Sequence, residues 1–268
     1  MEVAVLDEAL RPRSGAKLLR LGRRHDGGYL VDARSVMAAD VLLSFGINDD
    51  WSFEADFRKL NASPIYAFDA SLQRKRLVKA VIEALPRIDN PRLLMEKVRN
   101  LVGYARFFGR DARHIEAMVG LDRKPRYLSL TSVVESFVPA TASSVFLKID
   151  IEGWEYRILD ELVPLAERVC GLVIEFHNFD RHERDIADFV GALKLHVCHV
   201  HCNNFEPLNE RGVPLAIEIS LTRFAGEAET VRLPHPLDMP NDKRAEDYAI
   251  EFARPYASSK RTMSSSPR

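Results

Sequence analysis

The sequence predicts an α/β fold in which a mostly parallel sheet carries helices on both faces. Short apolar segments alternate with segments of helical periodicity through most of the 268 residues, a pattern typical of repeated β-α units. The last two apolar segments are joined by a polar loop without a helix, so the last strand is expected to run antiparallel to the strand before it. Two further short segments flank the turn Asp26-Gly27-Gly28 and predict a hairpin over residues 17–31.

Seven apolar segments are expected to form the strands of the sheet. Each is bounded by glycine, proline or polar residues, and the fourth is a strong candidate with five apolar residues of seven. The third is chosen from a stretch, residues 104–120, with little periodicity. The expected strands are Val41–Phe45, Ile65–Phe68, Ile115–Val119, Val145–Ile151, Leu172–Phe176, Leu195–Val200 and Leu215–Leu221.

Helical periodicity fills most of the intervals between these strands. The expected helices cover residues 49–60, 73–85, 91–103, 131–137, 153–165 and 181–193. The chain is therefore divided into an N-terminal hairpin or extension, a main domain, a C-terminal extension and a disordered tail with five serines and little to bury. These parts are residues 1–37, 38–225, 226–254 and 255–268.

Composition narrows the class of protein. The formal net charge is −1 and 46% of residues are apolar, which is ordinary for a globular chain and does not call for a nucleic-acid partner. The first residues lack the pattern of a signal peptide, and no segment has the roughly 20 uninterrupted apolar residues of a membrane span. Three cysteines do not make a disulfide framework, so a reducing, cytoplasmic location is expected.

A glycine and an acid follow the first two strands, where ligands bind in open α/β sheets. Gly46 would let the backbone approach a ligand, and Asp69, 23 residues later, is placed to accept hydrogen bonds from both ribose hydroxyls of an adenosine ligand. The same residues also fit an ordinary strand-to-helix turn with a helix-capping acid, since a dinucleotide loop would carry more glycines.

Three pairs of acidic or histidine residues, each two positions apart, stand at the ends of later strands. Members of such a pair share a face of an extended strand and lie about 7 Å apart. Together they are candidate ligands of a divalent cation that lowers the pKa of an acceptor hydroxyl. Alternatively His177 or His201 is a general base, any one histidine is a satisfied or exposed side chain, and Glu152 caps the next helix. The pairs are Asp150 with Glu152, Glu175 with His177, and His199 with His201.

The stretch LKIDIEGWEYRIL, residues 147–159, resembles the signature of the FkbM-type methyltransferase family. Four other segments resemble parts of that family in the same order, so the resemblance covers roughly residues 20–225. They are DGGYLV, LLSFGINDDWSFE, YAFDAS and HVHCNNF. The resemblance implies a seven-stranded, Rossmann-like class I methyltransferase fold, S-adenosylmethionine as methyl donor, and O-methylation of a hydroxyl on a sugar, glycolipid or natural product.

The resemblance also implies roles for single residues. Phe45 and Gly46 would lie against the cofactor, Asp69 would hold its ribose, and Asp150 would face the reaction centre, with Glu152 beside the cofactor. The family pattern has glycine or a small residue where this chain has Asn48 and Asp49. The expected partner is a small-molecule or glycan acceptor, contacted by loops and insertions at 86–113 and 203–213.

Three other functions remain open at this point. A nicotinamide-dependent oxidoreductase shares the glycine-then-acid pattern, but the missing glycines and the closing strand pair count against it. A non-catalytic binding module would keep the fold without turnover. A hydrolytic metal site would use the three strand-end pairs without a cofactor. The basic run Arg74-Lys75-Arg76 is most simply a solvated helix face.

Overall fold

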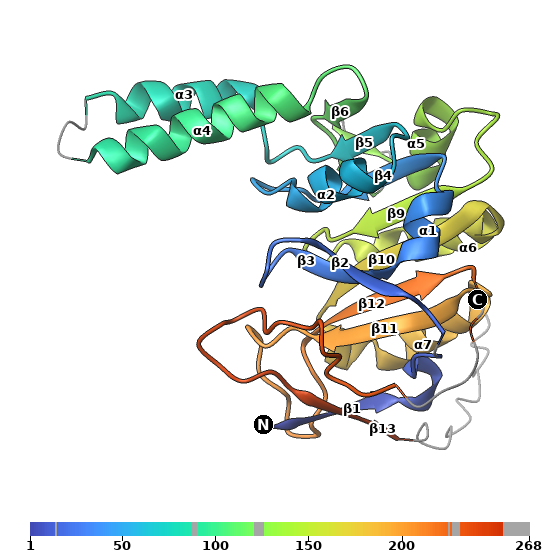
Figure 1. Ribbon diagram of the computed structural model, residues 1–268. Coiled ribbons are helices and arrows are strands. Elements are labelled where there is room, and N and C mark those ends of the chain that lie inside the picture. The colour runs from blue at the N-terminus through green and yellow to red at the C-terminus, as the bar shows by residue number, and fades with distance from the viewer. Residues whose placement is uncertain (14, 87–89, 121–125, 225, 227–230, 254–268) are drawn as a thin grey trace, which may run out of the picture.

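The computed structural model describes residues 1–13, 15–86, 90–120, 126–224, 226 and 231–253. The tail predicted to be disordered, 255–268, lies outside these residues. A seven-stranded mixed sheet forms the centre of the molecule, in the order β11-β12-β10-β9-β4-β5-β6 (Figure 1). Its strands are β4 (Val41–Phe45), β5 (Ile65–Phe68), β6 (Ala112–Ile115), β9 (Val145–Ile149), β10 (Val169–His177), β11 (His196–Cys202) and β12 (Ala216–Thr222).

The sheet is parallel except at β12, which runs antiparallel to both β10 and β11. The α/β class and the antiparallel last strand are therefore confirmed. The expected third strand was placed three residues too late, because β6 starts at Ala112. An edge strand needs no continuous apolar run, so its short segment is hard to recognise. Met118–Val119 instead forms β7, which pairs outside the main sheet with β8 (Tyr127–Leu128).

Helices and a hairpin cover the two faces of the sheet. One face packs under α5 (Leu130–Phe137), α6 (Leu159–Leu165) and α7 (Glu183–Ala192), in the largest apolar cluster of the core. The other face packs under α1 (Ala33–Ala38), α2 (Ser52–Leu60) and the hairpin. Each helix buries one apolar face, as amphipathic spacing predicts.

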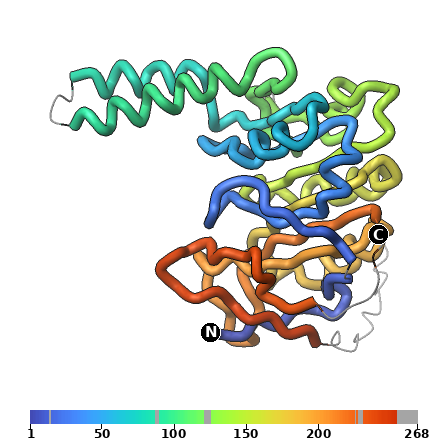
Figure 2. The backbone as a smooth tube through the Cα atoms, in the orientation of Figure 1, coloured from blue at the N-terminus to red at the C-terminus, as the bar shows by residue number. Residues whose placement is uncertain are grey.

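The predicted N-terminal hairpin is present as β2 (Leu18–Gly22) and β3 (Gly28–Asp32), paired antiparallel. It lies against the sheet, where the Ser220 hydroxyl on β12 donates to the carbonyl of Leu30 at 2.6 Å. The two ends of the described chain also meet, because β1 (Val3–Asp7) pairs in parallel with β13 (Ala249–Ala253) beside β11 and α7 (Figure 2). Both extensions are thus built onto the main domain.

Two antiparallel helices project from the sheet as an arm (Figure 1). They are α3 (Arg74–Ala84) and α4 (Pro91–Phe107), close to the expected ranges, with α4 one turn longer. Asn90 caps α4 by accepting from the amide of Leu93, and Pro91 occupies its first turn. Among the described residues, no helix is long and apolar enough to cross a bilayer.

Candidate functional site

A pocket of about 620 Å³ opens at the carboxyl ends of the central parallel strands, the position at which open α/β sheets bind ligands. It is lined by the loop after β4, by Asp69 after β5, by the turn after β9 and by the end of β10. The sequence-predicted residues Gly46, Asp69, Asp150, Glu152 and His177 all line it.

The glycine after β4 is required by the backbone itself. Gly46 has a φ of 75°, and a Cβ there would lie 1.6 Å from the carbonyl oxygen of Asp150. Its carbonyl accepts a hydrogen bond from the buried ammonium of Lys148. The adjacent Phe45 side chain is fully buried and packs edge-on against Phe68 at 5.4 Å, in the core rather than the pocket.

Asp69 joins the ends of the first two parallel strands. Its Oδ2 accepts from the amides of Ile47 at 3.0 Å and Asn48 at 2.7 Å, and its Oδ1 accepts from the amide and hydroxyl of Ser71 at 2.6 Å each. Burial opposes the charge of this carboxylate, but these hydrogen bonds outweigh it and lower its pKa. The backbone donors of the glycine loop are therefore already bound by a carboxylate.

The strongest sequence motif forms a turn at the pocket floor. β9 ends at Ile149, so Asp150 and Glu152 do not continue the strand as expected; Glu152 instead has a left-handed φ of 55°. The turn still brings both carboxylates to the histidine that ends β10. Ligand atoms of Asp150, Glu152 and His177 all lie within 4.8 Å of one another.

A buried glutamate orients that histidine. Glu155 is fully buried, and its Oε1 lies 3.1 Å from Nδ1 of His177, which directs Nε2 toward the pocket. Nε2 is 3.6 Å from Oε2 of Glu152 and 3.9 Å from Oε1 of Glu175. Burial opposes the imidazolium, but the hydrogen bond to Glu155 and the charge of Glu175 raise the pKa of His177 to about 9.

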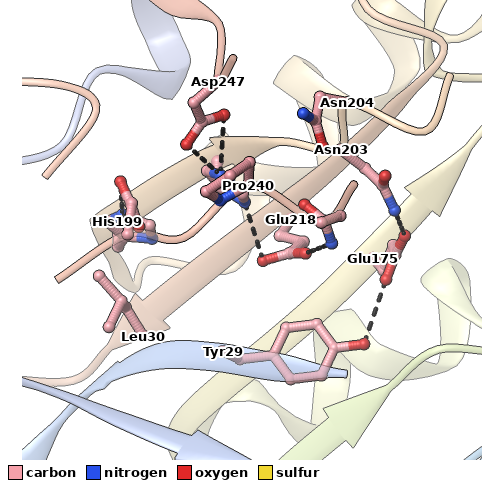
Figure 3. Close-up of polar contacts among 12 residues, drawn as sticks. Tyr29, Leu30, Glu175, His199, Asn203, Asn204, Glu218, Pro240 and Asp247 are labelled. Carbon is pink, nitrogen blue, oxygen red and sulfur yellow. Dashed lines mark hydrogen bonds and ion pairs between the residues drawn. The ribbon is translucent and has the colours of Figure 1, made fainter. Parts of the chain in front are cut away.

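A tyrosine from the hairpin links two of the carboxylates. The hydroxyl of Tyr29 lies 2.9 Å from Oδ2 of Asp150. It also lies 3.1 Å from Oε2 of Glu175, and Asn203 donates to the other oxygen of Glu175 at 2.8 Å (Figure 3). Burial and the charge of Asp150 raise the pKa of Glu175 to about 8. The five residues Asp150, Glu152, Glu155, Glu175 and His177 are called the open cluster below.

The pocket is strongly acidic. Nine carboxylate residues line it, against one arginine, one lysine and one histidine. Such a surface attracts a cationic ligand and repels phosphate groups. The nine are Asp26, Asp49, Asp50, Glu54, Asp69, Asp150, Glu152, Glu175 and Glu206.

Aromatic side chains form a wall of the pocket beside the acids. Trp154 stacks on Tyr127, with ring centroids 5.2 Å apart and planes inclined by 23°. The guanidinium carbon of Arg157 lies 3.8 Å from the centroid of the Trp154 ring, and this cation–π contact helps to hold the indole in place. A flat apolar wall beside hydrogen-bonding groups suits the face of a sugar ring or another flat acceptor.

His199 and His201 lie in a different place. β12 is inserted between β10 and β11, so the third strand-end pair stands two strands away from the second, about 10 Å in sheet spacing. Neither histidine lines the pocket. The three pairs therefore do not converge on one point, and only the first two meet.

The two histidines are enclosed by carboxylates from β12 and from the segment at 235–247. His201 lies 3.4 Å from Glu218 and 3.0 Å from Asp247 on opposite ring nitrogens, and His199 lies 3.0 Å from Asp238 (Figure 3). Although burial opposes the charge, the two carboxylates raise the pKa of His201 well above its usual value. These five residues are called the closed cluster below.

Sequence reasoning did not single out several groups of the site. Tyr29 follows the hairpin turn, Glu155 follows the acidic motif, and Asn203 follows β11; all three belong to segments that carried the family resemblance. Lys148, buried on β9, was read only as part of that motif. The order of these segments along the chain could have indicated that they contribute to one site. Which of their side chains pair with one another depends on tertiary contacts.

No family model matches the chain, and no curated protein matches it significantly. Solved structures match at low similarity. An rRNA methylase from Streptococcus thermophilus is 11% identical with a TM-score of 0.38, over 71% of this chain and 90% of that one. A precorrin-6y C5,15-methyltransferase from Geobacter metallireducens is 13% identical with a TM-score of 0.33, over 70% and 86%. The METTL16 methyltransferase domain is 8% identical with a TM-score of 0.38, over 72% and 66%. Such values carry no argument about function or substrate.

Proposed function

We propose that the chain is an S-adenosylmethionine-dependent methyltransferase of the FkbM type that methylates a hydroxyl on a sugar, glycolipid or natural-product acceptor. The observation that carries the proposal is the acidic pocket at the carboxyl ends of the parallel strands. S-adenosylmethionine brings a sulfonium and an ammonium group, so an acidic pocket is complementary to it. The family resemblance of residues 147–159 supports the same assignment.

The same pocket argues against a nicotinamide dinucleotide. A pyrophosphate needs free backbone amides at the first strand-to-helix turn. Here the amides of Ile47 and Asn48 donate to Asp69 instead. The surrounding carboxylates would repel the two phosphate charges. Neither the geometry of the loop after β4 nor the charge of the pocket therefore supports a dinucleotide-dependent oxidoreductase.

Within this proposal each residue of the pocket has a task. Gly46, Asp150 and Glu152 border the cationic part of the cofactor, and Asp69 with Ser71 stands at its ribose end. Trp154 and Tyr127 pack on the acceptor. The cofactor supplies an activated methyl group, so the chain mainly has to align the acceptor oxygen with it.

His177 is the proposed general base, oriented by Glu155 through Nδ1. With a pKa of about 9 it is protonated at neutral pH, where it balances the carboxylates around it. Positive charge bound beside those carboxylates weakens their hold on the proton and lowers the pKa of His177. A cationic ligand in the pocket therefore prepares His177 to accept the hydroxyl proton. His201, the other predicted base, has no proposed part in the reaction.

As the alternative to a general-base role for His177, we propose that the pocket takes a divalent cation at Asp150, Glu152 and His177; Nε2 of His177 is the only nitrogen free, so it either binds the ion or accepts the proton. These residues fit one, because two carboxylates and one imidazole converge and Glu155 holds the second ring nitrogen, as in many metal sites. Such a cation lowers the pKa of a bound hydroxyl when present. Glu175 borders the same point, whereas His199 and His201 belong to the closed cluster.

Calorimetry with S-adenosylhomocysteine tests the cofactor. We expect micromolar binding to the wild-type chain and at least tenfold weaker binding to Asp69→Ala, with unchanged binding to Asp188→Ala, an exposed acid of α7 that does not line the pocket. Titration with Mn²⁺, followed by its electron paramagnetic resonance signal, tests the cation separately. Absence of S-adenosylhomocysteine binding, with and without Mn²⁺, would reject the methyltransferase proposal.

A further inference from the structure

The arm formed by α3 and α4 presents a set of exposed apolar side chains. Thirteen large apolar residues are exposed among the described residues, and six of them belong to this arm. Their exposed fractions run from 40% to 71%, so they are not covered by the rest of the chain. They are Val78, Ile82, Leu85, Met95, Val98 and Val102.

Helix geometry places all six on one side of the arm. Each follows directly after a residue of lower exposure that faces inward, and is therefore turned by about 100° about the helix axis. Ile82 after Val81 and Met95 after Leu94 are examples. Because α3 and α4 are antiparallel, the same right-handed turn moves both sets toward the same face of the pair. This surface is called the arm face.

Basic residues flank these apolar positions. Arg92, Arg99 and Arg106 are spaced seven apart, so they form a row along α4 next to Met95. Lys75, three residues before Val78 on α3, stands to it as Arg92 stands to Met95. No carboxylate among the described residues forms an ion pair with these four basic residues. The two helices hold eight basic and two acidic side chains, a net charge of +6, on a chain whose formal net charge is −1.

We infer that the arm face docks the protein on an anionic lipid surface. Aliphatic side chains and methionine between basic residues are what an interfacial helix presents to lipid headgroups and to the first methylenes beneath them. A second copy of the chain would bring another arm of charge +6 against the first, which charge repulsion opposes. Nucleic acid would match the charge but not the aliphatic residues, because bases stack on aromatic rings, and the six exposed apolar residues include none.

The location of the arm gives this docking a use. α3 starts at Arg74, three residues after Ser71, which lines the pocket together with Asp69. A surface bound to the arm therefore lies on the side of the molecule to which the carboxyl ends of the strands point (Figure 1). The inference does not depend on the proposed chemistry, because binding to lipid can be measured on the protein alone.

Vesicle co-sedimentation of the full chain tests the inference. We expect binding to vesicles of phosphatidylcholine with 30% phosphatidylglycerol at 0.1 M NaCl, no binding to phosphatidylcholine alone, and release by 0.5 M NaCl. The variant Arg92→Gln/Arg99→Gln/Arg106→Gln should partition about 100-fold less, at roughly a fivefold loss for each arginine. Ile82→Ser/Met95→Ser should lose about tenfold, from the apolar part alone.

The matched control is Arg13→Gln/Arg184→Gln/Lys243→Gln, which removes three exposed basic residues outside the arm and should bind vesicles like the wild type. Circular dichroism of each variant checks that it is folded. The inference is overturned if folded wild-type protein stays in the supernatant with anionic vesicles. It is also overturned if Ile82→Ser/Met95→Ser converts a dimer to a monomer in light scattering, or if it leaves vesicle binding intact while RNA competes for the arm.

Discussion

Two clusters of histidine and carboxylate residues in this molecule have similar composition and opposite access to water. In the open cluster the side chain of His177 is 23% exposed and its Nε2 faces a pocket. In the closed cluster the side chain of His201 is 3% exposed and both of its ring nitrogens meet carboxylates. Residues 235–247 cover the second cluster, and within the described part of the chain no segment covers the first in the same way.

The groups around each histidine decide whether it can bind a ligand or only stabilises the fold. A histidine held on one nitrogen by a buried glutamate keeps the other nitrogen for a ligand, as His177 does. A histidine held on both nitrogens, as His201 is, becomes a buried cation that neutralises Glu218 and Asp247 and ties the C-terminal segment to β11 and β12. The arrangement around His177 leaves a nitrogen available for catalysis or ligand binding, whereas the arrangement around His201 stabilises the fold.

The largest expected effect comes from breaking the closed cluster. His201→Gln removes the cation between two buried carboxylates, which we expect to lower the free energy of unfolding by about 3–5 kcal/mol. Urea denaturation at pH 7 measures it. His196→Gln, at the first position of the same strand, should change it by less than about 0.5 kcal/mol. A loss below 1 kcal/mol for His201→Gln would mean that Glu218 and Asp247 do not need that charge.

The corresponding change in the open cluster should act on turnover. Under the proposed function, His177→Gln lowers kcat by about 100-fold, the usual cost of losing a general base. It also removes the charged partner of buried Glu155, so the free energy of unfolding falls by about 1–3 kcal/mol. Initial rates and urea denaturation give the two numbers. His182→Gln, outside the pocket, is the control and should keep wild-type rates. Turnover within twofold of wild type in His177→Gln would remove this residue from the mechanism.

The two clusters should also set the pH dependence of stability. Glu175, His177 and His201 have pKa values above their usual values of 4.5 and 6.5, so the folded chain binds these protons more tightly. Stability from Glu175 is complete below about pH 4.5 and lost as pH rises through about 8; that from His177 is complete below about 6.5 and lost through about 9.

The stability contributed by His201 is likewise complete below about pH 6.5 and is lost as the pH rises through its raised pKa. We therefore expect thermal stability to fall between pH 6.5 and 9, by at most about 1.4 kcal/mol per pH unit for each group. Scanning calorimetry across this range measures the slope, which should become shallower in His201→Gln. A melting temperature that rises with pH in the wild type would contradict the assignment.

The smallest expected effect is stabilisation by a divalent cation. Mn²⁺ at about ten times its dissociation constant adds about 1.4 kcal/mol, which raises Tm by about 3–5 °C. Glu152→Gln should abolish the shift, whereas Asp238→Asn in the closed cluster should keep it despite a lower starting Tm. Thermal shift assays compare the three proteins. If both variants lost the Mn²⁺-induced rise in Tm equally, the ion would not bind specifically at the open cluster.

Most of the fold could be predicted from local patterns. Buried parallel strands are continuous apolar runs, so Val41–Phe45 and Ile65–Phe68 were placed to the residue. The hairpin followed from its turn chemistry, and the antiparallel last strand from the absence of a crossover helix. The third strand was misplaced because Ala112–Ile115 lies at the sheet edge, where polar residues such as Arg113 are tolerated.

The site could be predicted only in part. Residues at the ends of parallel strands meet by topology, which brings Asp150 near His177. Strand order cannot be read from periodicity, so the insertion of β12 between β10 and β11 and the separation of His199 from His177 were missed. The roles of Tyr29 and Glu155 depend on side-chain contacts across 146 and 22 residues, and no local pattern encodes them.

The parallel pairing of β1 with β13 has a consequence for synthesis of the chain. Val3 pairs with Ala249, so β1 is synthesised long before β13 and waits for that strand before its edge is covered. Ala4 and Leu6 are buried in the finished molecule. During translation they are exposed on an unpaired strand, which is a template for association with other chains. β1 thus completes its pairing only after β13 has been made.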